Sequence, residues 1–124
     1  MAKTDMSPTQ KIDLFKQIVL FWCQGLSANE FKVIMWIFAN TVGRGNITGR
    51  YSLNQLMKGV PKRSGDDWWC GGVGMSLSTL RRTLTSLQEL GALIILENTR
   101  WGTEYAINIE WTPQVEFTKR PKRT

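Results

Sequence analysis

The chain has 124 residues, of which 42% are hydrophobic and 21% charged, and it carries a net charge of +6 with an isoelectric point near 9.7. This length allows one modest hydrophobic core, so we expect a single domain. There is no histidine, and the two cysteines, Cys23 and Cys70, lie far apart. The usual general base and the usual zinc ligands are therefore missing, and we expect neither an enzyme nor a metal or cofactor site.

Membrane association is not indicated either. The longest apolar run, residues 18–23, is far shorter than the roughly 20 residues that cross a bilayer. The start of the chain lacks the apolar segment of a secretory signal. We therefore expect a cytoplasmic protein without a membrane partner.

The first predicted helix covers about residues 8–24. Ser7 followed by Pro8 is a typical helix start, and Gly25 is a typical stop. The apolar residues fall on two faces: Ile12, Phe15, Val19 and Trp22 on one, and Leu14, Ile18 and Phe21 on the other. We expect such a helix to be sandwiched within the domain or shared with a partner, for example a second copy of the chain.

Two capping boxes predict the next two helices. Ser27 and Glu30 begin a helix whose apolar residues repeat at helical spacing up to Val42, with Trp36 in the core. Residues 43–50 contain three glycines and predict a loop, after which a very short strand is expected at residue 51. Ser52 and Gln55 form the second capping box and begin a short helix that stops at residue 59.

Residues 59–74 are too rich in glycine and proline for regular structure and too long for an ordinary connection, so we expect an inserted or functional loop. It contains Trp68 and Trp69, preceded by Asp66 and Asp67. These tryptophans could fold back as a lid, bind a partner protein or a second copy, or stack on nucleotides, and the adjacent acids disfavour the last. We take Trp68 and Trp69 as candidate partner-binding residues.

The third core helix is predicted to begin at Ser76 and to end at Gly91, which suits a left-handed cap. Its leucines advance by three or four residues and are expected in the core: Leu77, Leu80, Leu84, Leu87 and Leu90. The opposite edge carries hydroxyls and guanidinium groups in its first half. Residues 92–97 and 103–111 then predict two strands joined by a hairpin turn.

This order of elements predicts a mainly α fold with a small β-hairpin, the winged helix-turn-helix, with an extra N-terminal helix and a long loop between the second and third core helices. The expected domain covers residues 1–116, with its core at 26–111, followed by a basic tail at 117–124. In this fold the third helix enters a DNA major groove, and the hairpin, or wing, contacts the neighbouring backbone or minor groove.

The distribution of charge also favours a nucleic-acid partner. Residues 44–82 contain seven basic and two acidic residues, a net +5, whereas residues 83–117 contain one basic and five acidic residues, a net −4. A localised positive charge is typical of nucleic-acid binding, although a solvated face kept soluble by charge is the alternative. Phosphate anchoring is expected from Arg44, Arg50, Lys58, Lys62, Arg63 and the tail.

Base reading is expected from the start of the third core helix. Arg81 is able to donate two parallel hydrogen bonds to guanine, whereas Ser78 and Thr79 have the right length for phosphates or base edges. At the expected wing turn, Arg100 is suited to a narrow minor groove, but exposed arginines are also common at such turns. The complete set of candidate DNA-binding residues is Arg50, Lys58, Lys62, Arg63, Ser76, Ser78, Thr79, Arg81, Arg82, Thr85 and Arg100.

Residues 26–44, 50–59 and 75–95 resemble the amino-terminal, origin-binding domain of phage replication proteins of the lambda O type, and the stretch S-x-S-T-L-R-R-x-L also resembles recognition helices of GntR-type bacterial repressors. The resemblance implies that the third helix contacts DNA through Ser76, Ser78, Thr79, Arg81 and Arg82, with Arg100 acting from the wing.

The resulting expectation is a sequence-specific double-stranded DNA-binding protein, encoded by a phage or mobile element, that binds a replication origin. Two alternatives stay open. One is a transcriptional regulator with the same mode of DNA binding. The other is a protein-interaction module that docks on a host or replisome complex through the tryptophan-rich loop.

Overall fold

A serine precedes each of the four main helices. The computed structural model, which describes residues 6–63, 65 and 67–113, contains α1 (Pro8–Gln17), α3 (Ala28–Asn40), α4 (Leu53–Lys58) and α5 (Leu77–Leu90). In every case the serine Oγ accepts a hydrogen bond from the backbone amide three residues later. The two predicted capping boxes are confirmed, and Ser7 with Gln10 forms a third that had not been predicted. These starts are therefore determined by local sequence.

The first helical segment continues from α1 through a π-helical stretch, η1 (Ile18–Trp22), into α2 (Cys23–Gly25), so its predicted extent is confirmed. It buries Leu14, Ile18 and Trp22. The helix is not sandwiched, because each predicted face is buried only in part: Ile12 and Phe15 of the first face are 55% and 44% exposed, and Phe21 of the second is 41% exposed. The expectation that the helix is sandwiched within the domain is therefore wrong, and the alternative, that its exposed apolar residues are shared with a partner, stays a prediction.

Three antiparallel strands form the main sheet, in the order β1 (Thr48–Tyr51), β5 (Gly102–Ile107) and β4 (Leu93–Thr99). The strand β1 is longer than expected because it pairs with β5 from Thr48 onward. Conversely, β5 stops before residue 111, because Asn108 turns the chain and bonds back to the start of β4. Trp111 then packs edge-on against Trp22, with ring centroids 4.9 Å apart.

The expectation of an irregular loop at residues 59–74 is wrong. Its two ends pair as an antiparallel hairpin of β2 (Gly59–Pro61) and β3 (Trp68–Gly71). Glycine permits this pairing, since a Cβ on Gly59 would lie 2.4 Å from the carbonyl oxygen of Cys70 and one on Gly72 would lie 2.0 Å from that of Met57. The glycines of this segment, which argued against regular structure, are therefore the residues that allow the close backbone contacts of the hairpin.

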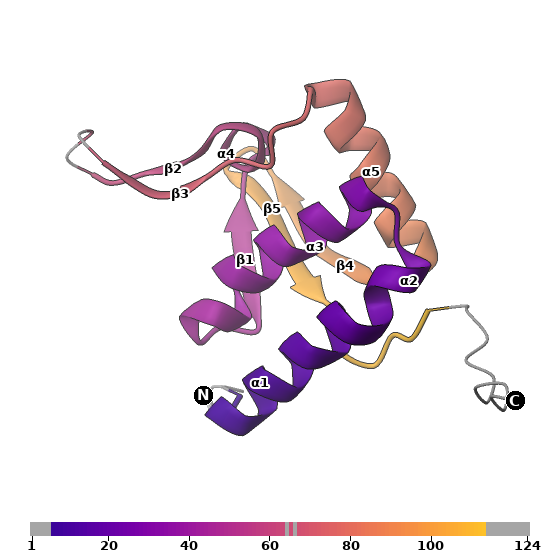
Figure 1. Ribbon diagram of the computed structural model, residues 1–124. Helices are drawn as coiled ribbons and strands as arrows, with labels where there is room; N and C mark the ends of the chain where they lie inside the picture. The colour runs from indigo at the N-terminus through magenta and orange to yellow at the C-terminus, as the bar shows by residue number, and fades with distance from the viewer. Residues whose placement is uncertain (1–5, 64, 66, 114–124) are drawn as a thin grey trace, which may run out of the picture.

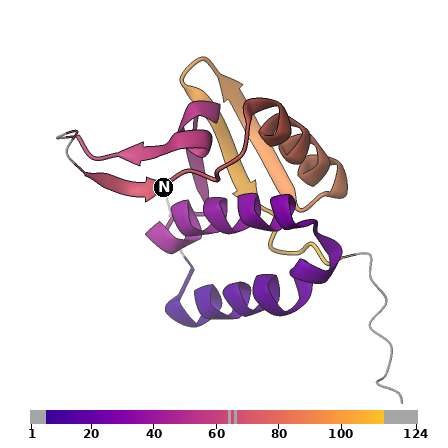
Figure 2. The ribbon, with the colours of Figure 1, turned by 45° about the horizontal axis from the view of Figure 1, so that its top comes forward.

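The helices and the sheet enclose one core. In Figures 1 and 2, α3 lies between α1 and the sheet, and α5 stands at the other end of the sheet from the β2–β3 hairpin. Trp22 and Trp36 are buried as predicted. The expectation that every leucine of α5 is in the core fails at its two ends, where Leu77 is 38% and Leu90 is 39% exposed. The chain is thus an α+β fold with more strand than the single predicted hairpin.

Two sequence-based expectations reach beyond this description. The predicted domain end at residue 116 and the basic tail at residues 117–124 lie outside the described residues. Within the described ranges, none of the helices combines the length and the apolar character that crossing a membrane would require.

Candidate nucleic-acid interface

The helix α5 is held at both ends and along one side. Its first turn is capped by Ser76, and it ends at Gly91, whose φ of +90° is the left-handed conformation that glycine adopts easily. Leu80, Leu84 and Leu87 are buried against the rest of the fold. The opposite edge is consequently turned outward, and both Arg81 and Arg82 are exposed.

The exposed edge of α5 contains the hydroxyl groups predicted from the sequence, but three of them, on Ser76, Ser78 and Thr79, already have partners among themselves. Ser76 Oγ accepts from the backbone amide of Thr79 at 3.3 Å and donates to Thr79 Oγ1 at 3.0 Å. Ser78 is exposed, but its Oγ forms a 3.3 Å hydrogen bond with Ser76 Oγ. The three hydroxyls of the first turn therefore bond to one another, which leaves Arg81, Arg82 and the exposed Thr85 outside this network.

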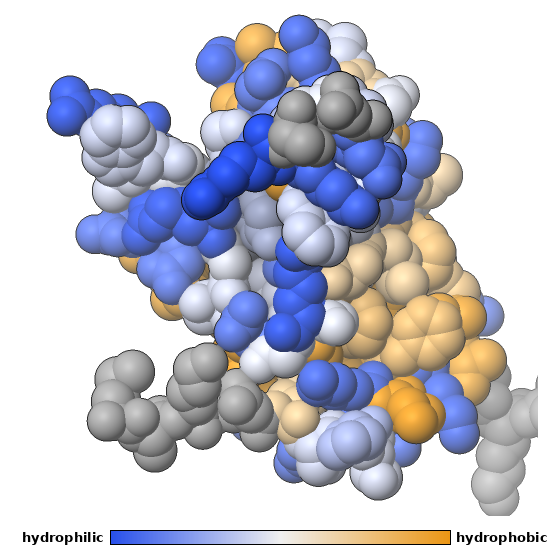
Figure 3. Space-filling view, turned by 90° about the vertical axis from the view of Figure 1, so that its left-hand side faces the viewer, coloured by the Kyte–Doolittle hydropathy of each residue, from blue (hydrophilic) through white to orange (hydrophobic). Residues whose placement is uncertain are grey.

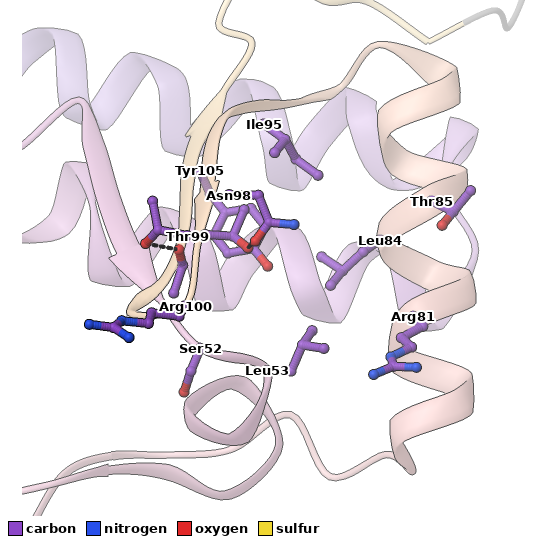
Figure 4. A pocket seen from close by; sticks show the side chains of 12 residues that line it. Ser52, Leu53, Arg81, Leu84, Thr85, Ile95, Asn98, Thr99, Arg100 and Tyr105 are labelled. Atoms are coloured by element: carbon purple, nitrogen blue, oxygen red, sulfur yellow. Dashed lines mark hydrogen bonds between the residues drawn. The ribbon is translucent and has the colours of Figure 1, made fainter.

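A hollow of about 480 Å³ separates α5 from the β4–β5 hairpin. Leu53, Leu84, Ile95 and Tyr105 contribute apolar lining, and Figure 4 shows Arg81 extending from α5 toward this space. The lining also includes three of the predicted DNA-binding residues, which are Arg81, Thr85 and Arg100. The structure thus brings together predicted DNA-binding residues that are up to 19 positions apart in the sequence.

Sequence reasoning missed several polar residues of the same hollow. Ser52, Asn98, Thr99 and Thr103 also line it. Asn98 Oδ1 accepts a hydrogen bond from Thr103 Oγ1 at 2.9 Å, which joins the two strands of the hairpin near its turn. A strand pattern does not single out such residues, because alternation tells which face they occupy but not which helix lies opposite.

Arg82 faces a different neighbour. It lines a second hollow, of about 350 Å³, between α5 and the start of α3, together with Ser27, Thr79 and Ser86. There Glu30 accepts hydrogen bonds from the Ser27 backbone amide at 2.7 Å and from the Ser86 hydroxyl. This carboxylate therefore caps α3 and ties it to α5. The two arginines lie on either side of the exposed edge of α5.

Arg50 is surrounded by partners within the chain. Its guanidinium forms an ion pair with Glu97 at 2.5 Å and lies 3.6 Å from Glu104. It also donates to Thr99 Oγ1 and to the Gly102 carbonyl, each at 3.1 Å. Arg50 thereby ties β1 to the β4–β5 turn, and the phosphate contact predicted for it would compete with these bonds.

The remaining predicted basic residues lie away from α5. Lys58 is exposed at the end of α4. Lys62 and the exposed Arg63 follow β2 on the β2–β3 hairpin, where Lys62 forms a 3.2 Å ion pair with Asp67. The hairpin projects from the body on the far side of α4 from α5, as Figures 1 and 2 show. The structure therefore separates the basic residues into two groups.

The interpretation of Trp68 and Trp69 as a lid is wrong, because the two side chains are 55% and 60% exposed. The Trp69 ring is flanked by two cations, with the Arg44 guanidinium carbon 5.5 Å and Lys62 Nζ 5.2 Å from its centroid. The partner-binding role of these tryptophans stays a prediction. Nothing in the sequence signals the Arg44–Trp69 contact, since 25 positions separate the two residues.

Tyr51 connects the core to this cationic region. Its hydroxyl donates to the Asn40 carbonyl at 2.7 Å, and its ring packs edge-on against Trp36 at 5.0 Å. Burial raises the pKa of Tyr51 above its ordinary value of 10.0, and the nearby Arg44 partly opposes this shift. The phenol is therefore neutral at physiological pH and acts as a hydrogen-bond donor.

Comparison of the chain with protein-family models, with curated proteins and with solved structures gives no match.

Proposed function

We propose that this protein binds double-stranded DNA in a sequence-specific manner, with α5 in the major groove and the β4–β5 turn on the neighbouring backbone or minor groove. The order α3, β1, α4, α5, β4 and β5 supports a winged helix-turn-helix arrangement, in which the β2–β3 hairpin is an insertion between the second and third core helices. The antiparallel sheet β1–β5–β4, which joins the early strand to the hairpin, supports the same arrangement.

One observation carries this proposal: Arg81 on α5 and Arg100 on the β4–β5 turn line the same open hollow. The leucine edge of α5 is buried, so the helix has a fixed rotation and presents the arginine edge outward. A major groove about 12 Å wide admits an α-helix, and arginine is the residue that most often reads guanine there. Arg100 is then placed beside the same duplex.

The available side chains suggest a division of roles. Arg81 and Arg82 read base edges, because they are exposed on either side of the helix edge. Ser78 and Thr85 contact phosphates or nearby bases, and Lys58 adds a contact to the backbone.

The biological setting of the proposal rests on the resemblance to lambda O-type proteins, which points to binding of a replication origin by a phage-encoded or mobile-element protein. A transcriptional regulator would use the same groove chemistry. The two roles are separated by mapping the bound sites. Several repeated sites in one locus support origin binding, whereas one or two half-sites that overlap a promoter support regulation.

The proposal is tested by selecting duplexes from a random pool and measuring the Kd of the selected site by fluorescence anisotropy. Arg81→Ala is expected to weaken binding by about 1–3 kcal/mol, or about 5- to 150-fold, and to relax the base preference at one position. Lys16→Ala, which removes one charge from the exposed surface of α1, is the matched control and is expected to leave Kd nearly unchanged.

Salt dependence gives a second readout. If about six phosphates are contacted, the affinity of the wild type falls on the order of a thousandfold between 50 and 200 mM salt. Equal affinity of the wild type and Arg81→Ala for the selected site would overturn the placement of α5 in the groove. The absence of any selected duplex would overturn DNA recognition itself.

A further inference from the structure

We propose that the β2–β3 hairpin is a second DNA-contacting element, which binds a backbone phosphate outside the base pairs read by α5 through Arg44, Lys62 and Trp69. This inference rests on the proposed function, and it extends the contact surface beyond the helix and the β4–β5 turn. It assigns a DNA contact to Trp69, for which the sequence favoured binding of a protein partner over contact with nucleotides.

The cluster is already assembled around the Trp69 ring. Arg44 and Lys62 lie 5.5 and 5.2 Å from the ring centroid, within the distance at which an aromatic ring attracts a cation. Arg44 is also held from behind, because its Nε donates to Oδ1 of the buried Asn40 at 3.2 Å. Two cations with restricted positions lose little conformational entropy when they bind a phosphate.

The charge and polarity of this surface favour a polyanion. Of the two acids that disfavoured nucleotide contact in the sequence, Asp67 is paired with Lys62 at 3.2 Å, and Asp66 lies outside the described residues. Among the described residues near the ring, the exposed Arg44 and Arg63 leave an excess of positive charge. Hydrophilic side chains predominate on the upper part of the face in Figure 3, from which the hairpin projects, and the apolar area lies lower.

The position of the hairpin is set firmly relative to α5. The helix α4 contacts both β2 and α5, and in Figures 1 and 2 it lies between the hairpin and α5. At the base of the hairpin, Trp36 Nε1 donates to the Gly71 carbonyl and the Val73 amide donates to the Leu56 carbonyl, both at 2.7 Å. The hairpin is therefore anchored to the core where β3 ends, and β2 follows directly from α4.

The hairpin carries the cluster away from α5. The strand β2 begins at Gly59, directly after α4, and Lys62 lies three residues beyond Gly59. The hairpin projects on the far side of α4 from α5, as Figures 1 and 2 show. The phosphates that it is placed to meet therefore lie outside the base pairs that α5 reads.

The test uses the selected site in two lengths. The short duplex contains only the base pairs that define the selected sequence, and the long duplex extends them by about ten base pairs, one helical turn, on each side. Arg44→Ala is expected to raise the Kd for the long duplex on the order of fivefold and to lower the magnitude of its salt slope by about 0.9, with little change for the short duplex. Trp69→Ala is expected to weaken long-duplex binding as well, because both cations lose the ring that holds them.

Lys16→Ala again serves as the charge-matched control, and circular dichroism verifies that each variant is folded. Variants of Arg44 and Trp69 that bind the long duplex as tightly as the wild type would overturn the inference and leave the hairpin to a protein partner. Equal losses on both duplexes would overturn it too, since they would indicate displacement of α5. In both cases wild-type binding to the selected site persists, so the proposed function stands. If the wild type binds no duplex, both proposals fail.

Discussion

Arg50 offers the sharpest test of how the β4–β5 turn is held. Its guanidinium joins β1 to Glu97, Thr99 and the Gly102 carbonyl at distances of 2.5–3.1 Å. The ion pair alone contributes at most about 1 kcal/mol, because the Glu97 side chain is 60% exposed. The half-buried bond to Gly102, made by a charged donor, contributes about another 1 kcal/mol. Arg50→Ala is therefore expected to lower the free energy of unfolding by roughly 1–2 kcal/mol, or about 4–8 °C in Tm.

The same residue distinguishes two roles in DNA binding. As a phosphate anchor, Arg50 would lower the magnitude of the salt slope by about 0.9 when replaced, and Arg50→Lys would retain most of the binding. As the residue that positions the turn bearing Arg100, it would leave the salt slope unchanged, and lysine would fail to substitute, because an ammonium lacks the planar fork that reaches several acceptors at once.

We expect the second outcome, measured by calorimetric melting together with anisotropy titrations at several salt concentrations. Lys58→Ala, at an exposed position, is the control that should reduce the salt slope. The positioning role of Arg50 is refuted if Arg50→Ala melts like the wild type while its salt slope falls, or if Arg50→Lys behaves like the wild type in both assays.

Three further predictions concern the framework around the interface. Leu87→Ala removes a fully buried side chain of α5 and should lower the free energy of unfolding, measured in urea, by about 2–5 kcal/mol. Leu77→Ala, at a side chain that is 38% exposed, should lower it far less. Similar losses for the two variants would contradict the described burial. Gly72→Ala places a Cβ 2.0 Å from the Met57 carbonyl oxygen and should destabilise the protein by about 1–3 kcal/mol in the same assay. A neutral effect would contradict the close approach of the Gly72 backbone to Met57. Burial raises the pKa of Tyr51, so its stabilising contribution is complete well below pH 10, where the phenol is protonated in both states, and is lost as the pH rises through the folded-state pKa. Burial raises the pKa of Tyr105 as well, so absorbance at 295 nm should show both tyrosines ionising late, and Tyr51→Phe should remove one of the two transitions with its part of the alkaline destabilisation.

The sequence was sufficient to identify the starts of the main helices and the buried edge of α5. Ser27 and Glu30, Ser52 and Gln55, and Ser76 all act within one helical turn, so their capping bonds depend on residues three positions apart and are readable without any tertiary contact. The spacing of leucines in α5 likewise determined which edge faces the core. It failed only at the ends, where a helix extends past the elements that cover it.

The β2–β3 hairpin and the contacts of the basic residues were decided by the tertiary structure. Residues 59–74 have no alternation that predicts strands, and they pair because glycines allow two backbones to approach beside α4. The Arg44–Trp69 contact and the Arg50–Glu97 pair join residues 25 and 47 positions apart. The sequence by itself therefore determined which residues are basic and which helix edge faces solvent. Only the fold decided which of those charges are paired within the chain and which stay exposed, because pairing depends on distances between elements that local periodicity does not encode.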